Sequence, residues 1–133
     1  MTKQEEIQRL KAEKDAAILA HFYVAPEIQE AADYIGDSFK LSRIAKDLPN
    51  QTIVFCGVSF MGESGKLLSP GNSILMPAPD AECPMAHMVT RQEVERARKQ
   101  YPDLAVVCYV NSTAEIKSWS DVCVTSANAV KIV

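Results

Sequence analysis

The segment DAECPMAHM, residues 80 to 88, places a thiol in a stretch that is too short and too interrupted for a core helix or strand. Cys83 precedes a proline, and His87 lies four residues after it. Such a segment is typical of a loop, and loops on rigid scaffolds often carry functional residues. A thiolate there could act as a nucleophile or as a ligand for a soft metal. A single histidine near a single cysteine is weak support for a metal pair, so we interpret His87 as a surface or loop-packing residue.

The other three cysteines, Cys56, Cys108 and Cys123, lie inside apolar runs. A free cysteine in such a run usually behaves as a small buried hydrophobe. No CxxC pair occurs, so the spacing of a zinc finger is absent. One thiolate cannot hold a metal cluster alone, and its partners would come from elsewhere in the chain, from other domains or from another subunit.

Polar residues follow the predicted strands at the points where each strand ends. In parallel α/β sheets, ligands bind beyond the carboxyl ends of the strands, and helix N-termini there add partial positive charge. The residues at these ends are His21, Tyr23, Gly57, Ser59, Met61, Tyr109, Asn111, Thr125 and Ser126. Together they could bind a small, oxygen-rich anion. The alternatives are structural: a histidine tied to a carbonyl, core tyrosines, and an asparagine that forms a turn.

The segment GESGK, residues 62 to 66, is similar to a phosphate-binding loop but does not match it. The pattern requires a glycine where Phe60 stands and a serine or threonine where Leu67 stands. The chain also has no GxGxxG. We therefore exclude nucleotide binding by these routes.

Strands and helices alternate along the chain. The predicted strands are residues 16–23, 52–58, 73–78, 104–110 and 122–126, and the predicted helices are 3–14, 26–36, 39–48, 60–68, 91–101 and 112–118. Asp37 or Ser38 is expected to cap one helix, and Thr90 with Glu93 forms a capping box for another. The alternation predicts a three-layer αβα sandwich with a parallel sheet of four to five strands. We expect a single α/β domain over residues 1–133 and a chain that is truncated at NAVKIV, in the opening turns of a helix.

The composition is that of an ordinary globular protein, with 47% hydrophobic residues, 23% charged residues and a net charge of -3. The charge argues against a nucleic-acid partner, which would need clustered Lys and Arg. No apolar run approaches the roughly 20 residues of a membrane helix. The charged N-terminal segment does not read as a signal peptide, so we expect a cytoplasmic location.

Four long segments of the chain carry a family resemblance. AHFYVAPEIQEAADYIGDS, VFCGVSFMGESGKLLSP, ILMPAPDAECPMAHM and VCYVNSTAEIKSWSDVCVTSANAV resemble, in order, the N-terminal domain of the quinolinate synthase (NadA) family of de novo NAD biosynthesis. The resemblance implies condensation of iminoaspartate with dihydroxyacetone phosphate to quinolinate, with loss of phosphate and two waters. L-aspartate oxidase is the implied supplier of iminoaspartate.

The resemblance also implies a cofactor. The family uses a 4Fe-4S cluster held by three cysteines, one from each of three similar α/β domains, with the fourth iron open as a Lewis acid. The cysteine of the AEC motif is the first ligand, and here it is Cys83. The other two cysteine ligands are not in this chain, so we expect the 133 residues alone to be inactive.

Further family positions match by motif. The implied catalytic residues are His21 and Tyr23, for substrate positioning and proton transfer. The implied substrate-binding residues are His21, Ser38, Tyr109, Asn111 and Ser126. Ser38 would bind a carboxylate or phosphate end of the substrate.

The residues themselves leave two other hypotheses about the function open. The chain could be an inactive module that binds a dicarboxylate or phosphate. It could also be a thiol redox protein that uses Cys83, although no paired cysteine supports that reading.

Overall fold

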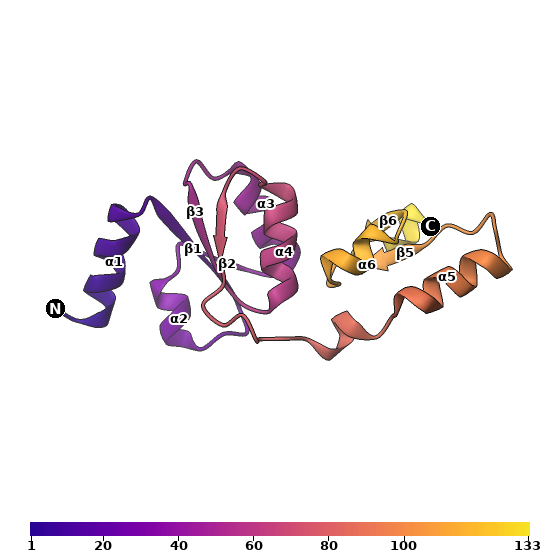
Figure 1. The fold of residues 1–133 in the computed structure, drawn as a ribbon. Helices are drawn as coiled ribbons and strands as arrows, with labels where there is room; N and C mark the ends of the chain where they lie inside the picture. The colour runs from indigo at the N-terminus through magenta and orange to yellow at the C-terminus, as the bar shows by residue number, and fades with distance from the viewer. The chain divides into compact units, whose positions relative to one another are not determined.

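Four parallel strands form a sheet in the first part of the chain, with helices on both of its faces (Figure 1). The computed structural model describes residues 1–133, which divide into two units, Met1–Ala81 and Glu82–Val133. The expectation of a single domain over the whole chain stays a prediction.

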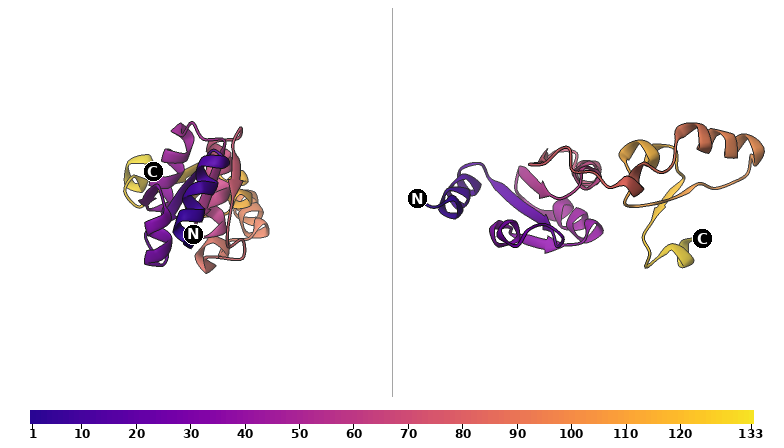
Figure 2. Two further views of the ribbon diagram at one scale, coloured as in Figure 1. Left: turned by 90° about the vertical axis from the view of Figure 1, so that its left-hand side faces the viewer. Right: turned by 90° about the horizontal axis from the view of Figure 1, so that it is seen from below.

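The first unit alternates helices and strands. Its elements are α1 (Lys3–Glu13), β1 (Ala16–His21), α2 (Pro26–Ala31), β2 (Tyr34–Gly36), α3 (Ser38–Asp47), β3 (Thr52–Cys56), α4 (Ser59–Leu68) and β4 (Ser73–Leu75). The strand order is β2-β1-β3-β4, and every pair is parallel. Right-handed crossovers then place α2 on one face and α3 with α4 on the other, and Figure 2 gives two further views of this arrangement. The predicted α/β sandwich with a parallel sheet is confirmed.

The core of this unit lies between the sheet and the α3–α4 layer. The side chains with no exposed surface include Leu19, Leu41, Ile53, Phe55 and Met61. Every second residue of β3 is buried, which fits a strand with one face toward this layer. The central strands β1 and β3 therefore have fixed positions, and so do the residues at their carboxyl ends.

One strand was missed by the sequence prediction. The sequence predicts one helix over residues 26–36, but α2 ends at Ala31 and β2 begins at Tyr34. The cause is Asp33, whose backbone N–H donates to the Ile18 carbonyl at 2.8 Å and whose carboxylate accepts from the Ile18 N–H at 2.8 Å. This long-range pairing with β1 overrides the local helix propensity.

The second unit contains a separate, smaller sheet. Its elements are η1 (Pro84–His87, a 3-10 helix), α5 (Arg91–Gln100), β5 (Val107–Tyr109), α6 (Ala114–Ser118), β6 (Val122–Val124) and α7 (Ala129–Ile132). The sequence predicts one sheet of four to five strands, but β5 and β6 pair in parallel only with each other. Asp121 helps to form this pair, because its carboxylate accepts from the Val106 N–H at 2.7 Å and from Arg98 at 2.9 Å. Hydrophobic patterning identifies strands but not their partners.

The helix starts follow the sequence closely. The Thr90 side chain accepts from the Glu93 N–H, and the Glu93 carboxylate accepts from the Thr90 N–H, so the predicted capping box is confirmed. Asp37 caps α3 by accepting from the Lys40 N–H at 2.8 Å. Both caps satisfy backbone donors that the first turn of a helix leaves open.

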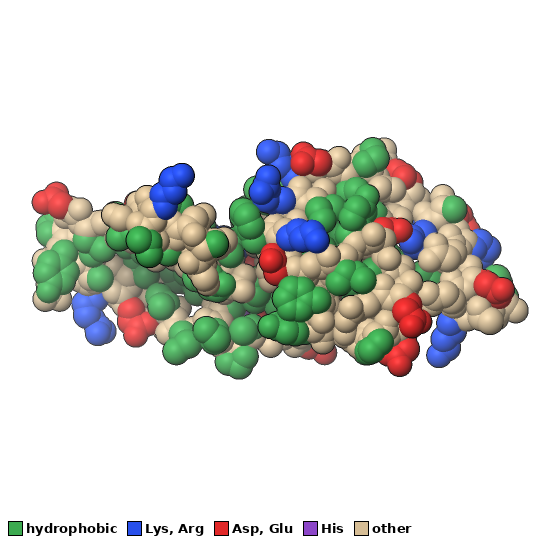
Figure 3. All heavy atoms as spheres, turned by 180° about the vertical axis from the view of Figure 1, so that it is seen from behind, with side chains coloured by type: hydrophobic (Ala, Val, Ile, Leu, Met, Phe, Trp, Pro, Cys, Tyr) green, Lys and Arg blue, Asp and Glu red, His purple; other side chains and the backbone are tan.

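The surface has no large region of one charge on the face that Figure 3 shows, because Lys and Arg side chains are interspersed with Asp and Glu. None of the helices has the length and apolar character that crossing a bilayer requires.

Candidate functional site

His21 ends β1 at the carboxyl edge of the first sheet, as predicted. Its Cα is in register with Gly36 of β2, and its Nδ1 accepts from the Tyr23 N–H at 3.2 Å. The His21 ring lies against both following aromatics, with centroid distances of 4.6 Å to Phe22 and 4.8 Å to Tyr23. Because Nδ1 is the acceptor, the neutral ring carries its proton on Nε2, the atom left for a ligand.

Tyr23 lies on the surface of the same turn. Its side chain is 84% exposed. The alternative interpretation, that Tyr23 is a buried core aromatic, is therefore wrong. Its backbone fixes the His21 ring while its hydroxyl stays accessible to a ligand.

Ser38 opens α3 directly after β2 and the Asp37 cap. It is 9% exposed, and its carbonyl accepts from the Ser42 hydroxyl at 2.9 Å. α3 starts at the same edge of the sheet at which β1 ends, since Gly36 pairs with His21. The first turn of a helix offers N–H groups and partial positive charge, which suit a carboxylate or phosphate.

The end of β3 approaches the same place through a glycine. A Cβ built at Gly57 would lie 2.6 Å from the Met61 sulfur and 3.5 Å from the His21 Cβ. Glycine therefore allows the chain to pass from β3 into α4 beside His21. The predicted edge residues His21 and Gly57 are brought together, with Ser38 on the neighbouring strand connection.

The charge of Asp37 acts on His21, and sequence reasoning assigned this residue only a capping role. Burial lowers the pKa of His21 from its ordinary value, and the Asp37 carboxylate partly opposes that shift. Asp37 follows directly after β2, the strand that was missed. Recognition of that strand would have placed Asp37 among the strand-end residues.

We expect the imidazole of His21 to titrate below 6.5, and Asp37→Asn to lower its pKa further. Asparagine keeps the N-cap of α3 but removes the charge that favours the imidazolium. The depressed pKa means that the unfolded chain binds the proton more readily. Stability from this group is therefore complete above pH 6.5 and is lost as the pH falls toward the folded-state pKa.

NMR titration of the imidazole protons measures both effects. The chain has two histidines, so His87→Gln assigns the signals. A His21 pKa that rises in Asp37→Asn would contradict the assignment of the two opposing causes.

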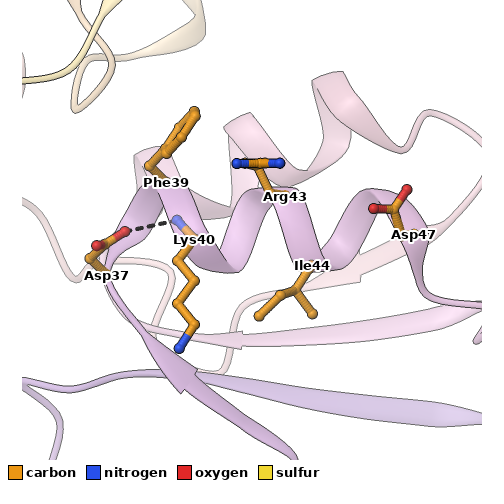
Figure 4. Close-up of a pocket in the computed structure, with 6 residues that line it drawn as sticks. All are labelled: Asp37, Phe39, Lys40, Arg43, Ile44 and Asp47. Carbon is orange, nitrogen blue, oxygen red and sulfur yellow. Dashed lines mark hydrogen bonds between the residues drawn. The ribbon is translucent and has the colours of Figure 1, made fainter. Parts of the chain in front are cut away.

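A shallow cavity of about 330 Å³ lies along the outer side of α3 (Figure 4). Its lining residues are Asp37, Phe39, Lys40, Arg43, Ile44 and Asp47. The basic Lys40 and Arg43 lie between the acidic Asp37 and Asp47 along α3. The Lys40 ammonium lies 3.4 Å from the Ile35 carbonyl. The cavity includes neither His21 nor Ser38, and Asp37 is the residue that it shares with the surroundings of His21.

Cys83 belongs to the second unit, in the segment that leads into η1. It is half-buried and forms no disulfide, and its carbonyl accepts from the Ala86 N–H at 2.9 Å. His87 pairs with Glu82, at 2.7 Å between Nε2 and Oε2. The loop prediction for Cys83 and the loop-packing role for His87 agree with this geometry.

Tyr109 and Ser126 meet at the carboxyl end of the small sheet. The Ser126 hydroxyl donates to the Tyr109 hydroxyl oxygen at 3.3 Å. The Tyr109 hydroxyl hydrogen then remains for a ligand, and the side chain is 42% exposed. Asn111 is half-buried two residues beyond β5. The structure thus brings together two predicted residues, Tyr109 at the end of β5 and Ser126 directly after β6.

The fold and the strand-end residues define an α/β protein with polar groups at the carboxyl ends of parallel strands and a thiol in a loop. Comparison with known sequences gives the family. A family profile described as Quinolinate synthetase A protein (NadA) matches residues 5–133. The chain belongs to this family.

Curated relatives agree over nearly the whole chain. A quinolinate synthase of Fusobacterium nucleatum is 57% identical over 130 residues, 98% of this chain and 44% of the relative. Quinolinate synthases of Caldicellulosiruptor bescii and Methanoregula boonei are 56% and 55% identical, over 96% and 98% of this chain and 42% and 43% of the relatives. The chain spans less than half the length of these relatives.

Proposed function

We propose that the protein to which these residues belong is a quinolinate synthase, which condenses iminoaspartate with dihydroxyacetone phosphate. The observation that carries this proposal is the family match over residues 5–133. From the same family resemblance we carry over a cytoplasmic location and L-aspartate oxidase as the source of iminoaspartate.

The donor set of this chain fits one ligand of a 4Fe-4S cluster. Cys83 offers a half-buried thiol outside any disulfide, and thiolate sulfur is the ligand that such clusters prefer. No group of three or more His, Cys, Asp or Glu side chains is placed to hold a metal ion. We therefore propose that Cys83 binds the cluster together with ligands from outside these residues. When bound, the cluster supplies a Lewis acid.

His21 is proposed to hold a proton at Nε2. Its lowered pKa keeps the ring neutral near pH 7, and the Tyr23 N–H occupies Nδ1. A neutral imidazole in this state can donate a hydrogen bond to a carbonyl or carboxylate oxygen, and it can pass on that proton. Tyr23 is proposed to assist from the same turn, and Ser38 to bind an anionic group at the start of α3.

Tyr109, Asn111 and Ser126 are proposed to bind a carboxylate of the substrate. The hydroxyl of Tyr109 accepts from Ser126 and keeps its own hydrogen for the ligand. Because the Ser126 contact also orients the phenol ring, the pair acts as one donor unit. Asn111 adds an amide donor beyond the same strand.

The test is quinolinate formation by the complete protein under anaerobic conditions, with iminoaspartate and dihydroxyacetone phosphate. We expect Tyr109→Phe to lower kcat/KM by about tenfold, the loss of one hydrogen bond to a charged group. Tyr101→Phe is the matched control, since Tyr101 is an exposed tyrosine at the end of α5 and should leave the rate unchanged.

This experiment tests the proposed function and the proposed role of Tyr109 separately. A complete protein without any quinolinate formation would overturn the function. Normal kcat/KM in Tyr109→Phe would remove only the proposed role of Tyr109.

A further inference from the structure

Two cysteines outside the proposed cluster site lie side by side. Cys108 of β5 and Cys123 of β6 are register partners in the parallel sheet, and their sulfur atoms are 3.3 Å apart. We expected both to be buried hydrophobes, which holds for Cys108, but Cys123 is exposed. Packing of apolar side chains does not explain why an exposed thiol lies in contact with a buried one.

The sheet geometry suits a covalent link between them. In-register residues of neighbouring strands project their side chains to the same face, and the strands lie about 4.8 Å apart. That spacing is within the Cα separation of about 4.4–6.8 Å that disulfides span. The sulfur atoms need to approach by little more than about 1 Å to reach a bond length of about 2.0 Å.

We propose that Cys108 and Cys123 form a reversible disulfide site that reacts with small disulfide compounds of the glutathione class. The exposed Cys123 thiolate attacks one sulfur of oxidised glutathione, which forms a mixed disulfide and releases one glutathione. The Cys108 thiolate then attacks the Cys123 sulfur, forms the Sγ–Sγ bond and releases the second glutathione. The two protein thiols lose two protons and two electrons, and the glutathione disulfide gains them.

The environment of Cys123 sets the rate of this reaction. Burial, and next the hydrogen bond and charge of Cys108, raise the pKa of Cys123 to about 11, and Lys117 opposes this with a smaller effect. Little thiolate exists at neutral pH, so the pair resists accidental oxidation and reacts faster as the pH rises. Cys108 directly precedes Tyr109 in the sequence, but the disulfide proposal does not depend on the function proposed above.

Peptide mapping of the complete protein tests the proposal. Trypsin cleaves after Lys99, Lys117 and Lys131, so Cys108 and Cys123 fall on separate peptides with one cysteine each. After treatment with oxidised glutathione at about pH 9, where more thiol is ionised, mass spectrometry should find Gln100–Lys117 linked to Ser118–Lys131. Dithiothreitol should remove the link, and Cys56 should not join it.

Two variants assign the steps. Cys108→Ala should lose the link and leave a stable glutathione adduct on Cys123. Cys123→Ser, at the exposed position, should lose the link and leave the buried Cys108 unmodified. Recovery of both peptides as free thiols from the treated protein would overturn the proposal. So would a link from Cys123 to Cys56 at equal yield.

Discussion

Cys83→Ser is expected to strip the complete protein of most of its bound iron and to abolish quinolinate formation. A serine hydroxyl has nearly the size of the thiol, but its oxygen is a hard donor that rarely ionises, whereas iron–sulfur clusters require thiolate. Loss even of groups that only support a ligand costs about 10–100-fold in metal affinity. We expect the loss of a direct ligand to be at least that large.

The measurement is iron and acid-labile sulfide per protein after anaerobic purification, together with the visible absorbance of the cluster. Cys56→Ser is the matched control. Cys56 is a half-buried thiol at the end of β3 whose pKa burial raises, so it is a poor source of thiolate. A Cys83→Ser protein with undiminished iron would remove Cys83 from the ligand set. Equal iron loss in the control would show that the effect is not specific to that thiol.

Much of the fold follows from local signals. Thr90 with Glu93 marks the start of α5, and Asp37 marks the start of α3, because capping depends on side chains within one turn of the helix. The apolar runs of β1 and β3 mark the central strands, since short, continuous apolar runs rich in β-branched residues are typical of buried parallel strands. These elements begin and end close to where the sequence places them.

The remainder depends on contacts between distant residues. The Asp33 carboxylate converts the end of a predicted helix into the edge strand β2 through its pairing with Ile18. Asp121 ties the starts of β5 and β6 into their own sheet. Neither pairing has a signature in a single sequence, because a hydrogen bond between residues so far apart in the chain leaves no periodicity.

The candidate site divides in the same way. The positions of His21 and Tyr109 at strand ends could be predicted, because each ends an apolar run. The residues that set the pKa of His21 and the hydrogen bonding of Tyr109 could not be predicted. Asp37 acts on His21 across two strands, and Ser126 donates to Tyr109 from the connection after β6. Sequence reasoning finds the groups, and the tertiary structure sets their protonation and orientation.

The contact between Gly65 and Phe55 is expected to carry the largest effect on stability. A Cβ at Gly65 would lie 2.5 Å from Cε2 and 2.9 Å from Cζ of Phe55, whose side chain has no exposed surface. This contact sets how closely α4 lies against β3. Phe55→Ala should cost about 3–5 kcal/mol by leaving a cavity. Gly65→Ala should cost about 1–3 kcal/mol by overpacking.

A double-mutant cycle separates this contact from general damage. Phe55→Leu removes the two ring atoms nearest to the added methyl group, Cε2 and Cζ. Gly65→Ala should therefore cost about 1 kcal/mol less in that background. Gly71→Ala is the control, because nothing lies within 4 Å of its Cβ position, and it should change stability by less than about 0.5 kcal/mol. Hydrogen exchange of the β1 and β3 amides reports the first unit, while the single tryptophan, Trp119, reports the second. An equal cost of Gly65→Ala in both backgrounds would mean that the Phe55 ring does not set the distance between α4 and the sheet.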